Sequence, residues 1–418
     1  MVNMKLNNKI QCLISKGVII PAPFSVEIGD EVDPDRISPK GVVIHSGSRL
    51  QGEQTYIASG AQIGSEGPVT IDNCWIGPDV KLKGGFFSKA VFLEKASAGS
   101  GSHVREGTIL EEEASIAHTV GLKQTILFPF VTLGSLINFC DCLMAGGTSR
   151  KNHSEVGSSY IHFNYTPNQD KATASLLGDV PAGVMLNKKP VFLGGQGGLV
   201  GPCRLNYGTV VAAGTIQRQD ELKEDRLLFG GGMKRGSIKA PAGVYTGVKK
   251  IVQQNINYIG NLIALLDWYE HVRQRFISDV FPEELYNGLV LTLNIAIDER
   301  VKRFKALADK FRLSLSELKS SGQTTGSLVE QKQMFIDAWT ELDDKIMSLR
   351  MRPSGNAIEQ RTAFLGLLDT EQKKNNETRY IDLIQGLDSH TLLTGTTWLQ
   401  SIVDHFNEEL LQILPLFK

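Results

Sequence analysis

The sequence predicts an all-β parallel solenoid over residues 41–248, followed by an all-α helical domain over residues 249–418. Three observations support this fold class. Apolar residues recur every six positions in the first part, most of the 42 glycines precede Lys249, and apolar residues after Lys249 recur every three or four positions. Residues 1–40 lie before the repeats and are expected to form an N-terminal cap segment.

The six-residue repeat is the main evidence for the solenoid. It runs through Val104, Leu110, Ile116 and Leu122, and again through Leu193, Leu199, Leu205 and Val211. Small or compact side chains follow four residues later, at Thr108, Ala114, Val120, Gly197, Cys203, Thr209 and Thr215. A period of six fits neither an α-helix nor a long alternating strand, but it fits a short strand followed by a turn. We therefore expect the repeated apolar residues to point inward and successive coils to pair in parallel, with Cys203 as a packing residue.

The repeat is interrupted twice, over residues 84–101 and 140–179. A solenoid accommodates insertions as loops on one face, which is often the binding face. The second interruption predicts that the binding region lies within residues 140–179.

Beyond Lys249 the apolar spacing is that of one-sided helices. The apolar positions are Ile256, Ile259, Leu262, Ile263 and Leu266, then Val301, Phe304, Leu307, Ala308 and Phe311, then Met334, Phe335, Ala338, Trp339, Leu342, Ile346 and Leu349, and finally Trp398, Ile402, Val403, Phe406 and Leu410. Such stripes are typical of core packing. We assign no chemistry to the helical domain.

Composition and charge exclude several classes of function. The 44 Lys and Arg residues nearly balance the 45 Asp and Glu residues, so nothing supplies the basic surface that nucleic acid requires. No apolar stretch is long enough to cross a bilayer, and polar residues interrupt the first sixteen positions, where a secretory signal would be apolar. The five cysteines form neither a disulfide framework nor a zinc pattern. We expect a cytoplasmic protein with reduced thiols, no metal and no membrane partner.

Residues 192–215, FLGGQGGLVGPCRLNYGTVVAAGT, resemble the hexapeptide-repeat acyltransferases without gaps. The resemblance is closest to the acetyltransferase half of the bacterial bifunctional glucosamine-1-phosphate acetyltransferase / N-acetylglucosamine-1-phosphate uridyltransferase. Upstream, Lys151-Asn-His153 and His162-Phe-Asn-Tyr165 with Lys171 are similar to that family's active-site histidine and its Asn-Tyr segment followed by a lysine. The similarity covers residues 40–220 and is most specific over 130–215.

The resemblance implies a left-handed parallel β-helix that works as a homotrimer, with an acyl-coenzyme A site between neighbouring subunits. It implies that His153 is the general base, and this agrees with the chemistry, because an amine that attacks a thioester must lose a proton and a histidine accepts it near neutral pH. Acetyl-CoA, or another acyl-CoA, is then the expected co-substrate.

Further site residues follow from the same resemblance. Asn164 and Tyr165 offer groups that can hydrogen-bond sugar hydroxyls, and Arg150, Lys151 and Lys171 offer cations for a phosphate. For the coenzyme, Gly195 lies in a glycine-rich coil that leaves the backbone accessible, and Ala213 matches an alanine beside the coenzyme. Lys234 and Arg235 are candidates for its phosphates. For Arg150, Lys171, Lys234 and Arg235 an ordinary solvated surface position remains an open alternative.

The sequence also departs from the family pattern. The glycine-rich nucleotide loop of the uridyltransferase half is absent, so uridyltransferase activity is not expected. Asp141 stands where the relatives have lysines that hold the substrate phosphate, and its charge is expected to repel a sugar phosphate. About one coil is missing between His153 and Asn164.

Three hypotheses follow. The first is an acyl-CoA-dependent N-acetyltransferase acting on an amino sugar, sugar phosphate or nucleotide sugar such as one built on N-acetylglucosamine. The second is a non-catalytic trimeric solenoid that binds a sugar nucleotide or acts as a scaffold. The third, zinc chemistry on the same architecture, would need convergence of His118, His153 and His162, whose spacing does not fit.

Overall fold

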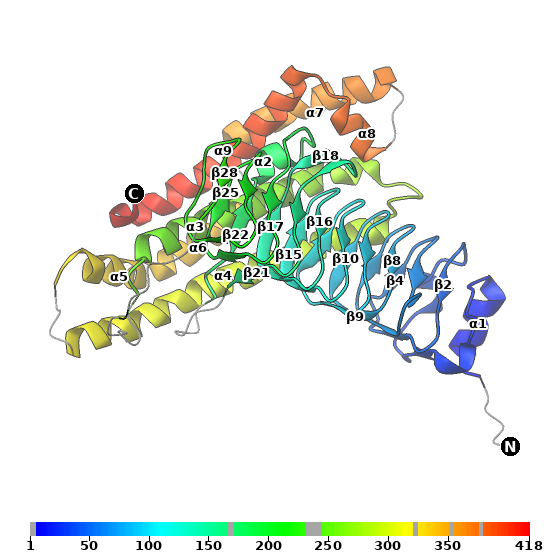
Figure 1. The fold of residues 1–418 in the computed structure, drawn as a ribbon. Helices are drawn as coiled ribbons and strands as arrows, with labels where there is room; N and C mark the ends of the chain where they lie inside the picture. The colour runs from blue at the N-terminus through cyan, green and yellow to red at the C-terminus, as the bar shows by residue number, and fades with distance from the viewer. Residues whose placement is uncertain are drawn as a thin grey trace.

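The computed structural model describes residues 6–164, 171–230, 237, 245–320, 325–351, 355–375 and 379–418. Tyr165, Lys234 and Arg235 lie outside these residues. A β-solenoid occupies residues 27–228, and long helices follow from Val248 onward (Figure 1). The predicted fold class, a solenoid followed by helices, is confirmed. Its first strand begins at Glu27, within the segment expected to be a cap.

The solenoid has three faces, each a parallel ladder with one short strand per coil. Face one contains β1 (Glu27–Ile28), β3 (Arg49–Gln51), β6 (Val69–Asp72), β9 (Gly85–Ser88), β12 (Ser102–Val104), β21 (Ile161–Phe163), β24 (Gly198–Val200) and β27 (Ile216–Gln217). Face two contains β4 (Tyr56–Ile57), β7 (Trp75–Ile76), β10 (Ala90–Phe92), β13 (Thr108–Leu110), β22 (Ser175–Leu177) and β25 (Arg204–Leu205). Two longer strands, β15 (Gly121–Leu127) and β17 (Asn138–Met144), turn from face one to face two.

Face three completes each coil. It contains β2 (Val43–Ile44), β5 (Gln62–Ile63), β8 (Lys81–Leu82), β11 (Ser97–Ala98), β14 (Ser115–Ile116), β16 (Thr132–Leu133), β20 (Glu155–Val156), β23 (Phe192–Leu193), β26 (Val210–Val211) and β28 (Leu227–Leu228). We number the corners in chain order: the first joins faces one and two, the second joins faces two and three, and the third joins face three to face one of the next coil.

The six-residue repeat lies in the interior, as predicted. All eight repeated apolar residues are buried, and so are Cys203 and most of the other compact side chains that follow them. The break in the period over residues 84–101 contains no inserted loop, because these residues form β9, β10 and β11. Only two residues separate β8 from β9. The corner between them is short, and this shifts the phase of the six-residue repeat although no loop is inserted.

Helix α1 (Asn8–Lys16) lies at the N-terminal end of the stack (Figure 1). It buries Ile10 and Leu13 against the core. The Lys9 Nζ atom donates to the carbonyl oxygens of Gly29 at 3.3 Å and Val32 at 2.6 Å, and Lys16 Nζ donates to the Pro34 oxygen at 2.7 Å. These bonds tie α1 to the backbone of the first coil.

The remaining helices pack against one another and against face two. They are α2 (Val180–Gly183), α3 (Val248–His271), α4 (Glu283–Ser320), α5 (Ser327–Asp337), α6 (Trp339–Met351), α7 (Gly355–Asn375), α8 (Tyr380–Gln385) and α9 (Ser389–Ile413). Helix α4 contacts β7, β10 and β13, whereas α3 contacts β22 and lies against α9. Face two is therefore covered by the chain itself. Among the helices that the structure describes, none is long and apolar enough to cross a membrane.

Candidate functional site

The coil that carries His153 contains a hairpin that the other described coils lack. After β17, the chain forms β18 (Gly147–Ser149) and β19 (Asn152–His153), which pair antiparallel at the second corner. Gly146 and Gly147 adopt φ of 102° and 100°, a region that favours glycine. A Cβ on Gly147 would lie 2.6 Å from the His153 Cα atom, so glycine is required for this close pairing.

His153 lies beside an acidic residue. Its Nε2 atom is 3.8 Å from the Glu155 Oε2 atom, and the two side chains are 18% and 44% exposed. The Nδ1 atom is buried and has no hydrogen-bond partner among the described residues.

The two basic residues at the tip of the hairpin differ in how they are held. The Arg150 Nη1 atom donates to the carbonyl oxygens of Glu113 at 2.9 Å and Phe130 at 3.0 Å, and to the Thr132 hydroxyl at 3.0 Å. Arg150 is thus bound along the second corner. Lys151 is exposed, and its backbone N–H donates to the Ser149 hydroxyl at 3.3 Å.

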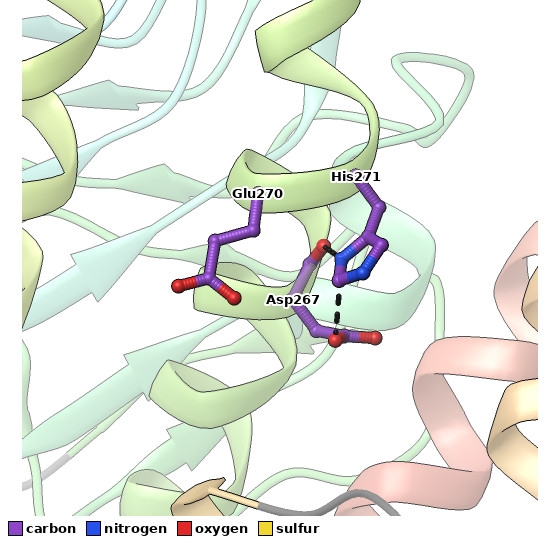
Figure 2. A group of neighbouring side chains, drawn as sticks. All are labelled: Asp267, Glu270 and His271. Carbon is purple, nitrogen blue, oxygen red and sulfur yellow. Dashed lines mark hydrogen bonds and ion pairs between the residues drawn. The ribbon is translucent and has the colours of Figure 1, made fainter.

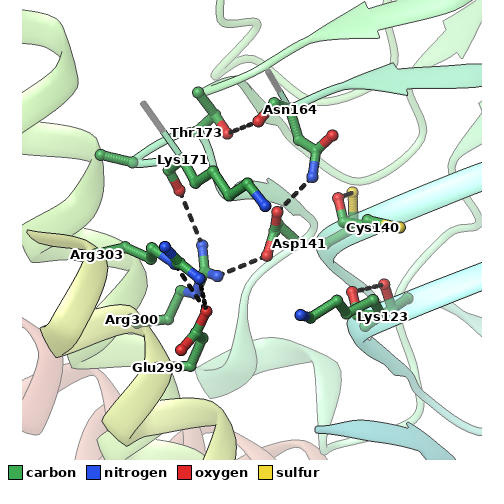
Figure 3. Close-up of polar contacts among 12 residues, drawn as sticks. Lys123, Cys140, Asp141, Asn164, Lys171, Thr173, Glu299, Arg300 and Arg303 are labelled. Carbon is green, nitrogen blue, oxygen red and sulfur yellow. Dashed lines mark hydrogen bonds and ion pairs between the residues drawn. The ribbon is translucent and has the colours of Figure 1, made fainter. Parts of the chain in front are cut away.

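Asn164 and Lys171 meet at the first corner, in a network that includes a helix (Figure 3). The Asn164 Nδ2 atom donates to Asp141 Oδ2, and the Thr173 hydroxyl donates to the Asn164 carbonyl oxygen at 2.8 Å. From α4, Arg300 donates to Asp141 Oδ1 and, at 3.3 Å, to the Lys171 carbonyl oxygen. Both partners of the Asp141–Arg300 ion pair are buried.

The Asp141–Arg300 pair corrects the expectation about the Asp141 charge. Repulsion of a sugar phosphate requires an uncompensated carboxylate that faces the ligand. Instead, Asp141 is buried and its charge is neutralised by Arg300. Sequence reasoning missed Arg300, which stands 159 residues further along the chain, and no local pattern links the two.

Gly195 and Ala213 lie at the third corner, in neighbouring coils. The Gly214 N–H donates to the Gly195 carbonyl oxygen at 2.9 Å, and a Cβ on Gly194 would lie only 2.3 Å from the Ala213 nitrogen. The adjacent coils thus approach closely because Gly194 has no side chain. Gly195 is half-buried and Ala213 is exposed, so backbone at this corner is accessible.

The predicted site residues that the structure describes therefore occupy three different corners of the solenoid. His153, Arg150 and Lys151 share the second corner, Asn164 and Lys171 share the first, and Gly195 and Ala213 share the third. Within one chain, the structure brings together the members of each group but does not join the three groups.

Two of the three histidines considered for zinc, His118 and His162, are engaged in other contacts. His162 is buried, its Nδ1–H donates to the Cys140 carbonyl oxygen at 2.6 Å, and its Nε2 atom is 2.8 Å from the Ser175 hydroxyl. Burial lowers the pKa of His162 to about 4, so it stays neutral. His118 Nδ1 lies 2.8 Å from the Ser135 hydroxyl, at the third corner. These contacts indicate structural roles for both residues.

Among the residues that the structure describes, Asp267, Glu270 and His271 of α3 lie close enough together to hold a metal ion (Figure 2). Both carboxylate oxygens of Asp267 already accept hydrogen bonds from other side chains. Asp267 Oδ1 accepts from Arg361 Nη1 at 3.0 Å, and Asp267 Oδ2 accepts from Trp398 Nε1 at 3.0 Å. Burial raises the pKa of Glu270, which weakens it as an anionic ligand. We interpret the group as part of the packing between α3, α7 and α9.

The fold and these motifs define a class of protein, a β-solenoid consistent with the hexapeptide-repeat acyltransferases. No protein-family model matches the chain. Curated relatives of the chain include bifunctional proteins GlmU. That of Thermotoga petrophila is 27% identical over 219 residues, which cover 51% of this chain and 42% of GlmU. Those of Pelobacter propionicus and Nitratidesulfovibrio vulgaris are 26% and 27% identical, over 51% and 50% of this chain and 41% and 40% of GlmU.

The chain thus spans about two-fifths of the length of the curated relatives it matches. The similarity to GlmU is distant and extends over half of this chain. The predicted relation to the hexapeptide-repeat acyltransferases is confirmed at that level.

Proposed function

We propose that this protein is an acyl-CoA-dependent N-acetyltransferase that acts on an amino sugar, a sugar phosphate or a nucleotide sugar. The observation that carries the proposal is the similarity to GlmU over half of the chain. In addition, Lys151-Asn-His153 resembles the segment that holds the family's active-site histidine. Acetyl-CoA is the proposed co-substrate.

His153 is the proposed general base. The substrate nitrogen attacks the thioester carbonyl carbon, a C–N bond forms, the C–S bond breaks, and coenzyme A leaves as the thiol. His153 accepts the proton that the nitrogen loses and delivers it to the departing sulfur.

The other site residues are proposed to hold the two substrates. Asn164, Tyr165 and Lys171, with Arg150 and Lys151, would bind the sugar and its phosphate. Gly195 and Ala213 carry no side chain beyond Cβ, which supports an approach of the pantetheine arm to the backbone at the third corner. Lys234 and Arg235 would contact the phosphates of the coenzyme.

A homotrimer would bring these groups together, because corners that are separate in one chain can lie against those of neighbouring copies. Two exposed apolar patches support this proposal. On face three, Phe192, Val210 and Leu227 are register partners in successive coils, and on face one, Ile161 and Phe163 are exposed at the same end of the solenoid. Face one of one copy packed against face three of the next would give a closed ring.

The test measures release of free thiol from acetyl-CoA in the presence of glucosamine 1-phosphate or a UDP-linked amino sugar. We expect turnover, and we expect His153→Asn to lower kcat by about 10²-fold or more. The matched control is His118→Asn, at a different corner, which should retain activity. Turnover that survives His153→Asn unchanged would contradict the assignment of the base.

A second candidate function is non-catalytic binding of a sugar nucleotide, or a scaffold role. The observation that favours it is the closure of the first corner by Arg300 of α4, which buries Asp141. In that case, calorimetry would detect binding of UDP-N-acetylglucosamine, but no thiol release would accompany any of the acceptors. The two assays together distinguish the candidates.

A further inference from the structure

The hairpin that carries His153 stands apart from the three ladders of the solenoid. Among the strands that the structure describes, β18 and β19 pair only with each other and form a two-stranded sheet of their own. A hairpin alone is only marginally stable in water, so contacts outside the hairpin must fix its position. Those contacts therefore decide where the His153 imidazole lies.

The base of the hairpin is bonded to the segment that follows α2, residues 184–191. The Gly147 N–H donates to the Lys188 carbonyl oxygen at 3.0 Å. Just beyond β19, the Ser154 hydroxyl accepts from the Val191 N–H at 2.8 Å. The segment after α2 thus holds the hairpin on both of its strands, and the two must move together.

The helical region, residues 248–418, fixes α2 and the segment that follows it. At the start of α2, the Val180 N–H donates to Asn261 Oδ1 of α3 at 2.9 Å, and Asn261 is buried. Met185 is also buried and packs against α9, where a Cβ on Gly395 would lie only 2.6 Å from the Met185 Cε atom. The base of the hairpin is therefore supported, through α2 and the segment after it, by two long helices.

Helix α8 also reaches the hairpin directly, as its place beside β18 shows (Figure 1). Gln385 is the last residue of α8, and its Nε2 atom donates to the Thr148 carbonyl oxygen of β18 at 2.6 Å and to the Leu186 carbonyl oxygen at 3.4 Å. One amide thus joins the hairpin to the segment after α2. Helix α8 is itself anchored, because the hydroxyl of the buried Tyr380 accepts from Trp268 Nε1 of α3 at 3.0 Å.

We propose that the helical region positions the base of the proposed reaction, and that Gln385 is a positioning residue for His153. The inference rests on the proposed function in one respect, the assignment of His153 as the base. In a catalytic site, a displacement of about 1 Å can lower the rate about a hundredfold. Gln385 opposes such a displacement because it holds Thr148 on the strand that pairs with β19.

Hydrogen exchange of the full-length chain, followed by mass spectrometry, tests this support without reference to activity. Gln385→Met keeps the length of the side chain but has no donor. We expect the amides of residues 147–153 to exchange about two- to tenfold faster than in the wild type, and those of residues 192–211 to exchange at the wild-type rate. Gln385→Lys, which restores a donor, should recover most of the protection. Unchanged exchange over 147–153 in Gln385→Met would overturn the proposal.

Thiol release from acetyl-CoA measures the consequence for the reaction. In Gln385→Met, kcat should fall about tenfold, whereas KM for acetyl-CoA should not change, because the proposed coenzyme groups Gly195 and Ala213 lie at the third corner. The matched control is Gln331→Met on α5, since the Gln331 amide likewise donates to a main-chain oxygen, that of Leu416, at 3.1 Å. This control should match the wild type in both measurements.

The two measurements separate the inference from the function on which it rests. Faster exchange in Gln385→Met together with an unchanged kcat would overturn the positioning role. A wild type that releases no thiol would instead refute the proposed function, and the exchange comparison would still decide whether Gln385 holds the hairpin.

Discussion

Glu111 is a carboxylic acid in the interior, where the solenoid meets α3. It accepts a hydrogen bond from the Tyr269 hydroxyl. Burial, and then the charge of Glu112, raise the pKa of Glu111 to about 7, well above its value of about 4.3 in an unfolded chain. The folded state therefore retains this proton over a pH range in which the unfolded state has released it.

The stability of the protein should consequently fall as the pH rises from about 4.3 to about 7 through this residue. We predict that Glu111→Gln, which keeps the acceptor for Tyr269 but cannot ionise, removes this loss. At pH 8 the variant should be more stable than the wild type by an amount on the order of 3 kcal/mol, and this gain should shrink toward pH 4. Urea unfolding at several pH values measures it. Glu317→Gln, at an exposed position on α4, should show no such trend.

The Asp141–Arg300 ion pair is a second feature at the residue scale, and breaking it should lower the stability measurably. Arg300→Met should lower the free energy of unfolding by about 3–5 kcal/mol, because it leaves the buried Asp141 charge with only the Asn164 amide. The double variant Asp141→Asn with Arg300→Met should recover much of this loss, since no buried charge remains. Arg312→Met, which breaks an exposed pair with Asp309, is the control. Equal effects of the two Arg→Met changes in chemical denaturation would contradict the buried-pair interpretation.

Among the elements, α4 approaches face two closely at one glycine. A Cβ on Gly288 would lie 2.3 Å from Trp75 Cγ, and Trp75 is 4% exposed. Glycine here allows the indole ring of β7 to fit against the helix backbone. The close approach also explains why α4 can run along β7, β10 and β13.

Gly288→Ala should therefore destabilise the protein, by about 1–3 kcal/mol, because the added methyl group displaces the ring or the helix. Gly366→Ala provides the matched control on α7, where nothing lies within 4 Å of the added Cβ. There, helix propensity alone should raise stability, by up to about 1 kcal/mol. Thermal unfolding should give shifts of opposite sign for the two variants.

The elements also show what the sequence could and could not predict. The solenoid was predictable because its inward-facing positions, such as Val104 and Leu199, must be apolar and because they recur at a fixed interval along the sequence. The helices α3, α4 and α9 were predictable from their apolar stripes. The run from Met334 to Leu349 is divided at Ala338 into α5 and α6, and α7 buries too few side chains to give a clear pattern.

The candidate site was predictable only in part. His153 and Asn164 belong to short motifs, which a sequence displays directly. Arg300 reaches the first corner only because α4 covers face two, and such docking depends on the shapes of two apolar surfaces rather than on local pattern.

For the whole molecule, the covered face leaves two faces open for assembly. Face three exposes Phe192 and Val210, each 39% exposed, and Leu227 in register with them. We predict that lysine at both Phe192 and Val210 converts a trimer into monomers, because it places charges in an apolar contact. Light scattering coupled to size exclusion measures the mass. Gln62→Lys, on the same face but far along the stack, should leave the trimer intact, and a monomeric wild type would contradict the prediction.

The lysines of α1 have a consequence for solubility. A stack of β-coils ends in a row of unsatisfied backbone groups, onto which another molecule can add strands. Lys9 and Lys16 donate to the carbonyl oxygens of Val32 and Pro34 in the first coil and place positive charge at that end of the stack. A second copy arriving end to end would have to displace these ammonium groups, so we expect α1 to oppose end-to-end association of the molecules.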